Sequence, residues 1–397
     1  MCGIAGWIDG ERYLPDQQTV LDNMSKTLQR RGPDDSGQYL EPNACLLHRR
    51  LAVVDPENGR QPMIAQAGNE TYALVYNGEL YNTDELRSQL EHIGCTFQTH
   101  SDTEVLLNAY AMWGKNCLSK LNGIFAFAVW EKNSRRLFAA RDRMGVKPFY
   151  YYEYPDGLIF GSEIKALLAN PLVEPVVDED GLNQIFLLGP GAIPGKAVYR
   201  GMKELAPGYC MTFTPENGVH LHRWWKLLAR EHTEDEKTSI EHVRALLTDS
   251  IRRQLVSDVP LCTLLSGGLD SSIISAVAAE KYRKQGRQLT TYSVDYVDNA
   301  KYFQRNRFQP APDSEYVGEM ADAIGSHHQN VILDNAAQAD TLLDAVRARD
   351  YPGMADIDSS LLLFCREIKK DFTVGLSGEC ADEIFGGYPW YHREEIL

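Results

Sequence analysis

The chain begins MCGIAG, and the cysteine that follows the first methionine is a candidate nucleophile. Removal of Met1 would place a free α-amine on Cys2 itself. An α-amine has a pKa near ~7.7–8.0 and a thiol near ~8.5, so a general base and a strong nucleophile would share one residue. The alternative interpretation is a buried cysteine without a chemical role, and position alone does not separate the two.

Four further residues of the first half suggest what this nucleophile would attack. Asn77 and Gly78, in YNGELYN, could donate a side-chain amide and a backbone N–H to an oxyanion, although Asn-Gly is also a hairpin turn. Arg50 could hold a carboxylate with two hydrogen bonds. Asp102 could pair with an α-ammonium or serve only helix capping beside Ser101. Together with a thiol, such residues indicate hydrolysis of an amino-acid side-chain amide.

Two glycine-containing stretches of the second half indicate an anion site. In LLSGGLDSS a strand passes into a helix, and backbone N–H groups at a helix start bind phosphate. The Walker A pattern GxxxxGK[ST] is absent. The second stretch, LSGECADEIFGGY, gathers Glu379, Asp382 and Glu383 near a helix start. These carboxylates would bind Mg²⁺ or take part in acid–base chemistry, or they would only stabilise the helix by ~0.3–1 kcal/mol each.

Composition narrows the class of protein. A chain of 397 residues is long enough for two domains. The net charge of −15, without a basic run, argues against nucleic acid or anionic membrane as a partner. The chain shows no signal peptide and no apolar stretch of the ~18 residues that a membrane helix needs. The eight cysteines form no CxxC pair, so we expect free thiols and a cytoplasmic location.

Strands and helices alternate in the first half. Residues 3–9, 44–55 and 71–82 carry strand-like apolar runs, and 123–142 reads as a hairpin. Residues 15–32 read as a helix with one apolar face. Helices are also expected at 82–94 and 101–114, with capping boxes from Asn82 to Glu85 and from Ser101 to Glu104.

The second half has short strands separated by helices. Strands are expected at 259–265, 289–296, 329–333 and 372–378, with helices after 271 and at 314–325 and 358–370. This rhythm predicts a parallel sheet covered on both faces. The charged stretch from Trp225 to Ser239 lacks strand character. We therefore expect domains at 1–215 and 240–397, joined by a linker at 216–239.

The first ~210 residues resemble the glutaminase domain of the class II, N-terminal-cysteine amidotransferases. The similarity rests on MCGIAG, RGPDDSG, HRRLAVVD, YNGELYN and SDTE, in this order. It implies an α+β fold, an α-β-β-α sandwich of the N-terminal nucleophile type, with glutamine as ammonia donor. It implies Cys2 as nucleophile, with Asn77 and Gly78 as oxyanion donors. The implied glutamine-binding residues are Arg50, Leu51, Ala52, Val53, Val54, Asn77, Gly78, Glu79 and Asp102.

The SGGLDSS stretch resembles the pyrophosphate loop of ATP pyrophosphatases, which have an α/β, Rossmann-like parallel sheet. The implied ATP-binding residues are Leu265, Ser266, Gly267, Gly268, Leu269, Asp270, Ser271, Val294, Ser377 and Gly378. Asp270, Glu379 and Asp382 are implied in Mg²⁺ binding or acid–base chemistry, and no structural metal is expected.

The two halves together resemble the asparagine synthetase B family, which hydrolyses glutamine. The resemblance implies that ATP activates aspartate as an acyl-adenylate, that ammonia released at Cys2 attacks it, and that AMP and PPi are products. Glutamine, aspartate and ATP are the implied small-molecule partners, with Mg²⁺ as cofactor. A homodimer is left open.

The chain also departs from this family. Family members continue beyond the FGGY motif, whereas this chain stops at Leu397, ten residues past Gly387. We therefore expect a fragment or an impaired synthetase half, with a working glutaminase. Two alternatives stay open: amidation of a different carboxylate, such as a cell-wall precursor, and a glutaminase domain beside a non-catalytic second domain.

Overall fold

The computed structural model of the chain describes residues 1–189, 191–305 and 312–394. Contacts divide the chain into two compact units, Met1–Glu231 with Val346–Met354 and His232–Ala345 with Ala355–Leu397. The chain end at Leu397, on which the expected truncation rests, lies outside the described residues. Within the described ranges no helix is both long and apolar enough to cross a membrane.

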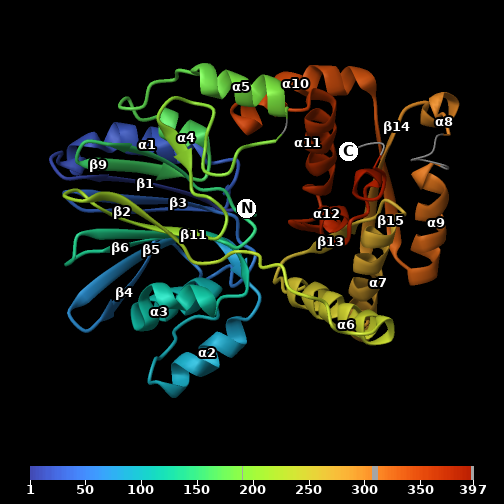
Figure 1. Ribbon diagram of the computed structural model, residues 1–397, viewed down its shortest axis with the longest axis horizontal. Helices are drawn as coiled ribbons and strands as arrows, with labels where there is room; N and C mark the ends of the chain where they lie inside the picture. The colour runs from blue at the N-terminus through green and yellow to red at the C-terminus, as the bar shows by residue number, and fades with distance from the viewer. Residues whose placement is uncertain (190, 306–311, 395–397) are drawn as a thin grey trace. The chain divides into compact units, whose positions relative to one another are not determined.

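The first unit consists of two stacked antiparallel sheets between two layers of helices (Figure 1). The sheets have the orders β10-β8-β9-β1-β3-β2 and β12-β11-β7-β6-β5-β4. The strands are β1 (Gly3–Asp9), β2 (Asp35–Leu40), β3 (Ala44–Arg50), β4 (Met63–Ala67), β5 (Glu70–Leu80), β6 (Gly123–Glu131), β7 (Arg136–Arg141), β8 (Tyr150–Tyr154), β9 (Gly157–Gly161), β10 (Met202–Glu204), β11 (Tyr209–Thr214) and β12 (Gly218–Arg223). The helices are α1 (Gln18–Thr27), α2 (Thr83–His92), α3 (Asp102–Trp113), α4 (Ile164–Leu168) and α5 (Glu179–Leu188). The predicted α-β-β-α sandwich is confirmed.

Alternating side chains explain why the central strands read as continuous apolar runs. On β6, Phe125 and Phe127 pack into the core beneath α3, whereas Ala126 and Ala128 pack between the two sheets. Because successive strand residues point to opposite faces, a strand covered on both sides must be apolar at almost every position. β6 therefore fixes the middle of the sandwich, and its pairing with β5 holds the YNGELYN strand in place.

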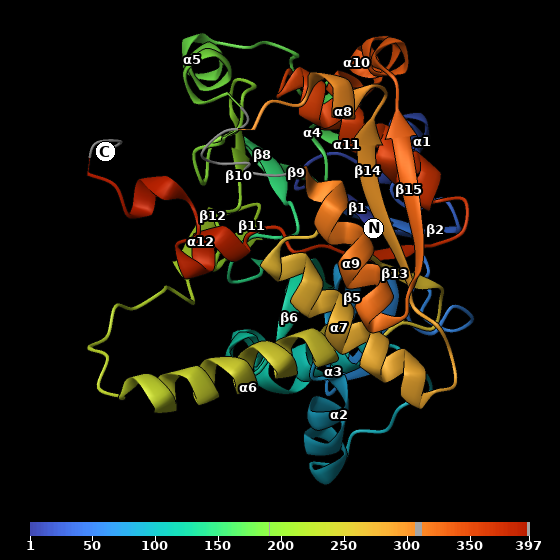
Figure 2. The same ribbon diagram turned by 90° about the vertical axis from the view of Figure 1, so that its right-hand side faces the viewer.

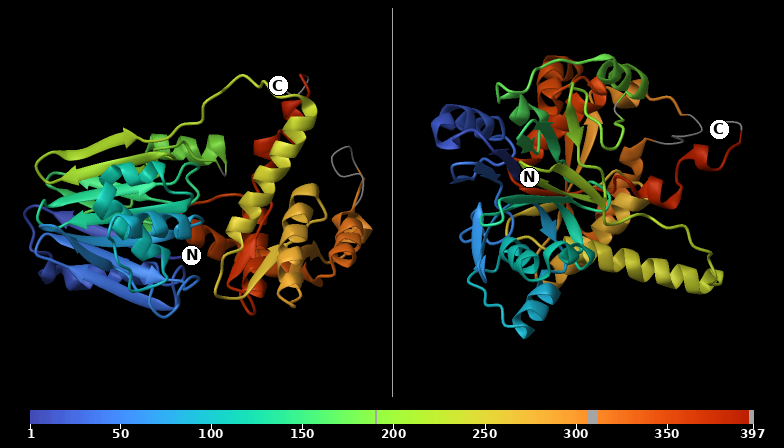
Figure 3. Two further views of the ribbon diagram at one scale, coloured as in Figure 1. Left: turned by 90° about the horizontal axis from the view of Figure 1, so that it is seen from below. Right: turned by 60° about the vertical axis from the view of Figure 1, so that its left-hand side comes forward.

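The second unit is built on a four-stranded parallel sheet of order β15-β14-β13-β16 (Figures 2 and 3). Its strands are β13 (Leu261–Leu264), β14 (Thr290–Tyr296), β15 (His327–Leu333) and β16 (Val374–Leu376). Its helices are α6 (Glu236–Gln254), α7 (Leu269–Lys284), α8 (Asn299–Tyr302), α9 (Asp313–Ile324), α10 (Asn335–Arg349), α11 (Ala355–Ile368) and α12 (Ala381–Phe385). One core packs α7 and α9 against the sheet and another packs α11, so both faces are covered as predicted.

Three local expectations differ from the structure. Asn82 does not cap α2 through its side chain; its amide instead donates to the Lys120 carbonyl and accepts from Asn122 N–H, joining two loops. Ser101 does cap α3 by accepting from Thr103 N–H, but Glu104 accepts from the preceding loop instead of completing the box. The stretch predicted as a linker contains β12, which pairs with β11.

Candidate active site

Cys2 lies immediately before β1, and both its backbone and its thiol form hydrogen bonds with neighbouring residues. Its carbonyl accepts a hydrogen bond of 2.9 Å from Nε of Arg31, and its thiol donates to the Leu51 carbonyl at 3.6 Å. Burial raises the pKa of the Cys2 thiol above its ordinary value. A thiol in this environment stays protonated near neutral pH, so attack on a substrate requires a base that takes its proton.

Asn77 lies on β5 with 1% of its surface exposed. Its side-chain Nδ2 is buried and has no hydrogen-bond partner within the described part of the chain. Most buried polar groups are paired, and an unpaired one costs about 1–3 kcal/mol. This buried amide is therefore free to donate a hydrogen bond to an oxygen atom of a substrate.

The edge of β5 beyond Leu74 offers backbone donors in the same region. The pairing of β4 with β5 runs from Glu70 to Leu74. Past it, Tyr76 N–H donates to the Gln61 side chain and Leu80 N–H donates to Asp102. Because alternate residues of a strand direct their N–H groups to the same edge, the Gly78 N–H points to this edge as well.

Position 78 requires glycine because neighbouring atoms leave no room for a side chain. A Cβ there would lie 2.4 Å from Cε2 of Tyr76 and 2.5 Å from the Ile124 carbonyl oxygen. We therefore expect Gly78→Ala to destabilise the first unit by about 1–3 kcal/mol, the range for overpacked positions. Thermal unfolding measures this effect. The control is Gly318→Ala in α9, where an added Cβ meets no atom within 4 Å; equal melting temperatures for the two variants would contradict the steric argument.

Arg50, predicted to hold a substrate carboxylate, ends β3 and organises the loop that follows it. Its guanidinium donates to the carbonyls of Val54, Asp55 and Pro56 at 3.2, 2.6 and 2.7 Å. The structure thus gives Arg50 a role that sequence reasoning missed, which is to shape the stretch from Leu51 to Val54.

Asp102, predicted to bind an α-ammonium, is the first residue of α3 and is 7% exposed. Its carboxylate accepts from the Tyr76 hydroxyl at 2.9 Å and from Leu80 N–H at 3.2 Å. Burial raises the pKa of Asp102. These contacts place Asp102 against the same edge of β5 that carries Gly78.

Several supporting residues received no role from the sequence pattern. Asp34, in RGPDDSG, accepts from Ala52 N–H at 2.9 Å and so holds the loop after β3. His48 is buried beside the Tyr76 carbonyl at 3.2 Å, and burial lowers its pKa to about 3, so this imidazole is neutral. Lys147 is buried with Nζ 3.0 Å from the sulfur of Met1, and burial lowers its pKa. The RGPDDSG stretch contributed to the family resemblance, but the contact between Asp34 and Ala52 became visible only in the fold.

The two glycine-containing loops of the second unit meet because β13 and β16 are neighbouring parallel strands. A Cβ at Gly378 would lie 3.0 Å from Ser271 N and 3.1 Å from Cβ of Asp270, so the loops are in direct contact. Gly267 has a φ of +82°, and a Cβ there would lie 2.8 Å from Cβ of Tyr316. The loop after β13 therefore requires glycine for both its conformation and its packing.

The loop before α7 and the first turn of α7 each carry one of the predicted nucleotide-binding hydroxyls. Ser266 Oγ lies 3.0 Å from Ser271 Oγ, and Ser271 donates to the Gly268 carbonyl at 3.2 Å. Val294, on the neighbouring strand β14, is 39% exposed. Leu265 is buried and its N–H donates to the Tyr292 carbonyl, which ties the loop to β14. Leu269 begins α7.

Acidic residues from both loops interact electrostatically. Partial burial raises the pKa of Asp270, and the charge of Asp382 adds to this effect. Two carboxylates that repel each other suit a divalent cation, and Mg²⁺ binds through one or two carboxylates together with phosphates. Among the described residues no group of three or more His, Cys, Asp or Glu is arranged as a complete metal site. Glu379 donates its backbone N–H to Ser377 Oγ at 3.2 Å.

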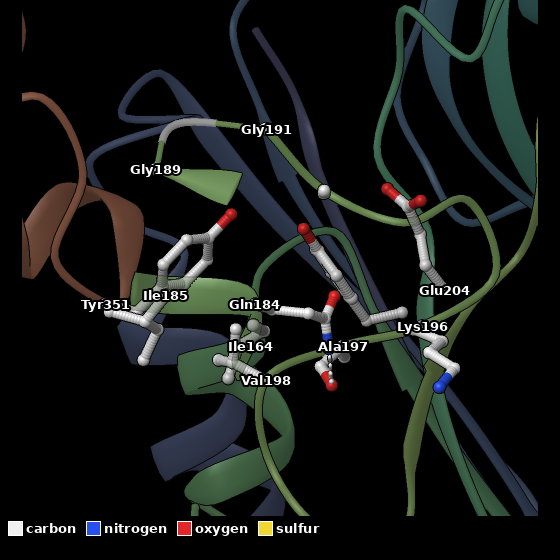
Figure 4. Close-up of a pocket in the computed structure, with 12 residues that line it drawn as sticks. Ile164, Gln184, Ile185, Gly189, Gly191, Lys196, Ala197, Val198, Glu204 and Tyr351 are labelled. Atoms are coloured by element: carbon white, nitrogen blue, oxygen red, sulfur yellow. Dashed lines mark hydrogen bonds between the residues drawn. The ribbon is translucent and has the colours of Figure 1, made fainter. Parts of the chain in front are cut away.

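The first unit also contains a small cavity away from these residues (Figure 4). Its volume is ≈ 10 Å³, enough for about one water molecule. Tyr150, Ile164, Glu204 and Tyr351 are among its lining residues, and no residue of the predicted glutamine site is.

Each half of the chain matches a known protein family. The family described as "Glutamine amidotransferase domain" matches residues 1–225, and the family described as "Asparagine synthase" matches residues 242–397.

Individual relatives align with all or nearly all of the chain. The chain is 50% identical to asparagine synthetase [glutamine-hydrolyzing] 3 of Bacillus subtilis over 100% of its length, and spans 64% of that protein. It is 32% identical to asparagine synthetase B [glutamine-hydrolyzing] of Escherichia coli over 99% of its length, and spans 66% of that protein. A solved glutamine phosphoribosylpyrophosphate amidotransferase of B. subtilis aligns with a TM-score of 0.46 and 19% identity, covering 98% of this chain and 97% of that one.

Proposed function

Since the chain belongs to the glutamine-hydrolysing asparagine synthetase family, we propose that it releases ammonia from glutamine at Cys2 for the amidation of aspartate. The observation that carries the glutaminase half is the buried, unpartnered Nδ2 of Asn77. The ammonia then attacks an aspartyl-adenylate formed from ATP, and asparagine, AMP and PPi are the products. We propose this reaction for the whole protein. The chain spans 64% and 66% of the length of the two asparagine synthetases named above.

In the proposed glutaminase reaction, removal of Met1 gives Cys2 a free α-amine. The amine takes the thiol proton as sulfur attacks the glutamine side-chain carboxamide. Asn77 Nδ2 and the Gly78 N–H donate to the oxyanion of the tetrahedral intermediate. The leaving nitrogen is protonated and departs as ammonia, and water then hydrolyses the thioester to glutamate.

Glutamine is proposed to bind along the edge of β5 and the loop after β3. Asp102 pairs with its α-ammonium, and Arg50 with its α-carboxylate. Arg50 has five N–H donors, so binding the loop carbonyls is compatible with a contact to substrate. The stretch from Leu51 to Val54 and Glu79 complete the lining of the pocket.

The proposed nucleotide site lies at the two contacting loops of the second unit. The backbone of Ser266, Gly267 and Gly268 and the start of α7 bind the pyrophosphate of ATP. Leu265, Leu269, Ser271, Val294, Ser377 and Gly378 are the other proposed nucleotide contacts. Asp270 and Asp382 would hold Mg²⁺, which neutralises phosphate charge when bound, and Glu379 is the proposed acid–base residue. Because Cys2 must stay reduced to act, we propose the cytoplasm as its location.

The test supplies the chain with glutamine labelled with ¹⁵N in its side-chain amide, in the presence and absence of Mg-ATP and aspartate. We expect glutamate release with glutamine alone, and PPi together with ¹⁵N-labelled asparagine only when ATP and aspartate are present. Absence of glutamate would refute the glutaminase site. Glutamate release without PPi would refute adenylation of aspartate by this chain, and PPi formation with another carboxylate would redirect the proposal to that acceptor.

A further inference from the structure

A run of alternately charged side chains leads from the backbone of Cys2 to Asp350. Arg31 donates from Nε to the Cys2 carbonyl at 2.9 Å and from Nη1 to Glu163 at 3.1 Å. The second carboxylate oxygen of Glu163 binds Nζ of Lys165 at 2.7 Å. Nζ of Lys165 also lies 3.0 Å from the carboxylate of Asp350. We refer to Arg31, Glu163, Lys165 and Asp350 as the charge chain.

The distal end of the charge chain is a short segment far away in sequence, Val346–Met354, which belongs to the first compact unit. Asp350 binds Lys165 twice, because its second oxygen accepts from the Lys165 backbone N–H at 2.9 Å. The Asp350 carbonyl accepts from the Tyr199 hydroxyl at 3.0 Å, and the Ala348 carbonyl accepts from Nζ of Lys165 at 3.2 Å. These contacts fix the segment at the point where it meets the start of α4.

The residues next to the charge chain are themselves tied to neighbouring elements of the first unit. Tyr351, the residue after Asp350, lines the small cavity together with Ile164 (Figure 4). Ser162, which precedes Glu163, is joined to β1 twice: its N–H donates to the Ile4 carbonyl, and its hydroxyl accepts from Ile4 N–H. A displacement of the stretch from Ser162 to Lys165 would therefore reach β1 two residues from Cys2.

All members of the charge chain are largely withdrawn from solvent. The exposed fractions of their side chains are 11% for Arg31, 18% for Glu163, 25% for Lys165 and 8% for Asp350. Ion pairs at such depth are screened less than surface pairs, and removing one partner leaves an uncompensated charge. Without the charge of Asp350, Lys165 would draw more strongly on Glu163, at the expense of the bond between Glu163 and Arg31.

We propose that the charge chain holds the backbone of Cys2 in its reactive position, and that Asp350 is a positioning residue for glutamine hydrolysis. This inference rests on the proposed glutaminase function of Cys2. Asp350 acts through Lys165, Glu163 and Arg31, not by contact with substrate. Glutamine hydrolysis thereby depends on a residue within the stretch matched by the "Asparagine synthase" family, outside the 1–225 match of the amidotransferase domain.

The variant that tests this is Asp350→Asn. Asp350 has a φ of +72°, and asparagine accepts this left-handed conformation, so the substitution removes charge without backbone strain. We expect kcat for glutamate release to fall roughly tenfold, since catalysis is sensitive to displacements on the order of 1 Å. KM for glutamine should stay unchanged, because Asp350 contacts none of the proposed glutamine-binding residues. The rate at which iodoacetamide alkylates Cys2, measured by mass spectrometry of the N-terminal peptide, should fall together with kcat.

A double-mutant cycle separates positioning from simple loss of structure. If the charge chain acts as one unit, Lys165→Met alone should lower kcat, and adding it to Asp350→Asn should cause little further loss. The matched control is Asp156→Asn, the same substitution at an exposed turn residue with a φ of +62°. It should leave kcat and the alkylation rate at their wild-type values.

Each result bears on the proposal. Wild-type kcat and alkylation rate in Asp350→Asn, or fully additive effects of the two substitutions, would overturn it. If Asp350→Asn does not fold, as judged by its melting temperature, Lys165→Met decides with the same two readouts. If the unaltered chain releases no glutamate, the proposed function fails, whereas the alkylation rates still show whether Asp350 positions Cys2.

Discussion

Replacement of Cys2 by alanine is expected to abolish glutamate release from glutamine. The Cys2 thiol is the proposed nucleophile, and an alanine side chain has no nucleophilic atom to replace it. Binding of Mg-ATP by the second unit should persist, because the proposed nucleotide loops lie in a separate compact unit. Glutamate release and equilibrium dialysis with Mg-ATP measure the two effects.

The pH dependence of the unaltered chain tests the same mechanism. Burial raises the pKa of the Cys2 thiol, so near neutral pH the thiol is protonated and attack requires the α-amine in its neutral form. An ordinary α-amine loses its proton near ~7.7–8.0, and kcat/KM should rise with pH through this range. Intact mass should show that Met1 has been removed in the active protein.

The control for Cys2 is Cys95→Ala, which removes another partly buried free thiol of the first unit. This variant should hydrolyse glutamine at the wild-type rate. Substantial glutamate release by Cys2→Ala would exclude Cys2 as the nucleophile. A retained Met1 in active protein would exclude the α-amine as the base.

The sequence predicted the strand and the loop that carry candidate residues where those residues lie within one local pattern. Asn77 and Gly78 are consecutive on a strand, and the loop after β13 connects a strand to a helix, so residue types and spacing were informative. Apolar alternation predicted β6, and the same rule explains why its two faces are both buried. The order of the strands within each sheet did not follow from such patterns, because it depends on contacts between distant residues.

The supporting contacts of Cys2 were not predictable for the same reason. Arg31, which follows α1, binds the Cys2 carbonyl, and Glu163 and Asp350 come from still more distant segments of the sequence. Arg50 was predicted as a substrate ligand from its side-chain chemistry and from the family resemblance. Its bonds to three loop carbonyls depend on a turn whose conformation sequence reasoning did not address.

Helix caps failed where a loop offered a competing partner. The Asn82–Glu85 spacing fits a capping box, but Asn82 binds Lys120 and Asn122 instead. The helix α10 was not predicted, although its alanine-rich sequence favours a helix. Periodicity was the signal used to find helices, and an alanine-rich stretch with a weak apolar face gives little of it.

Asn77→Ala is expected to lower kcat for glutamine hydrolysis by ~10²–10³ with a small change in KM, as for the loss of one oxyanion donor. Its effect on stability should be small for a specific reason. Nδ2 of Asn77 is buried without a partner, so the substitution breaks no hydrogen bond from this atom and removes an unsatisfied donor. A large loss of activity at nearly constant melting temperature is therefore the expected signature. Glutamate release and thermal unfolding are measured on the same preparation.

Asn69→Ala is the control, because Asn69 is an exposed residue beside the start of β5. It should change neither the rate nor the melting temperature. A raised KM with normal kcat in Asn77→Ala would assign Asn77 to ground-state binding. A melting temperature that falls together with kcat would mean that Asn77 supports the strand, and the oxyanion role would then lose its main support. The two readouts separate these cases because a donor that serves only the transition state contributes nothing to the folded protein in the absence of substrate.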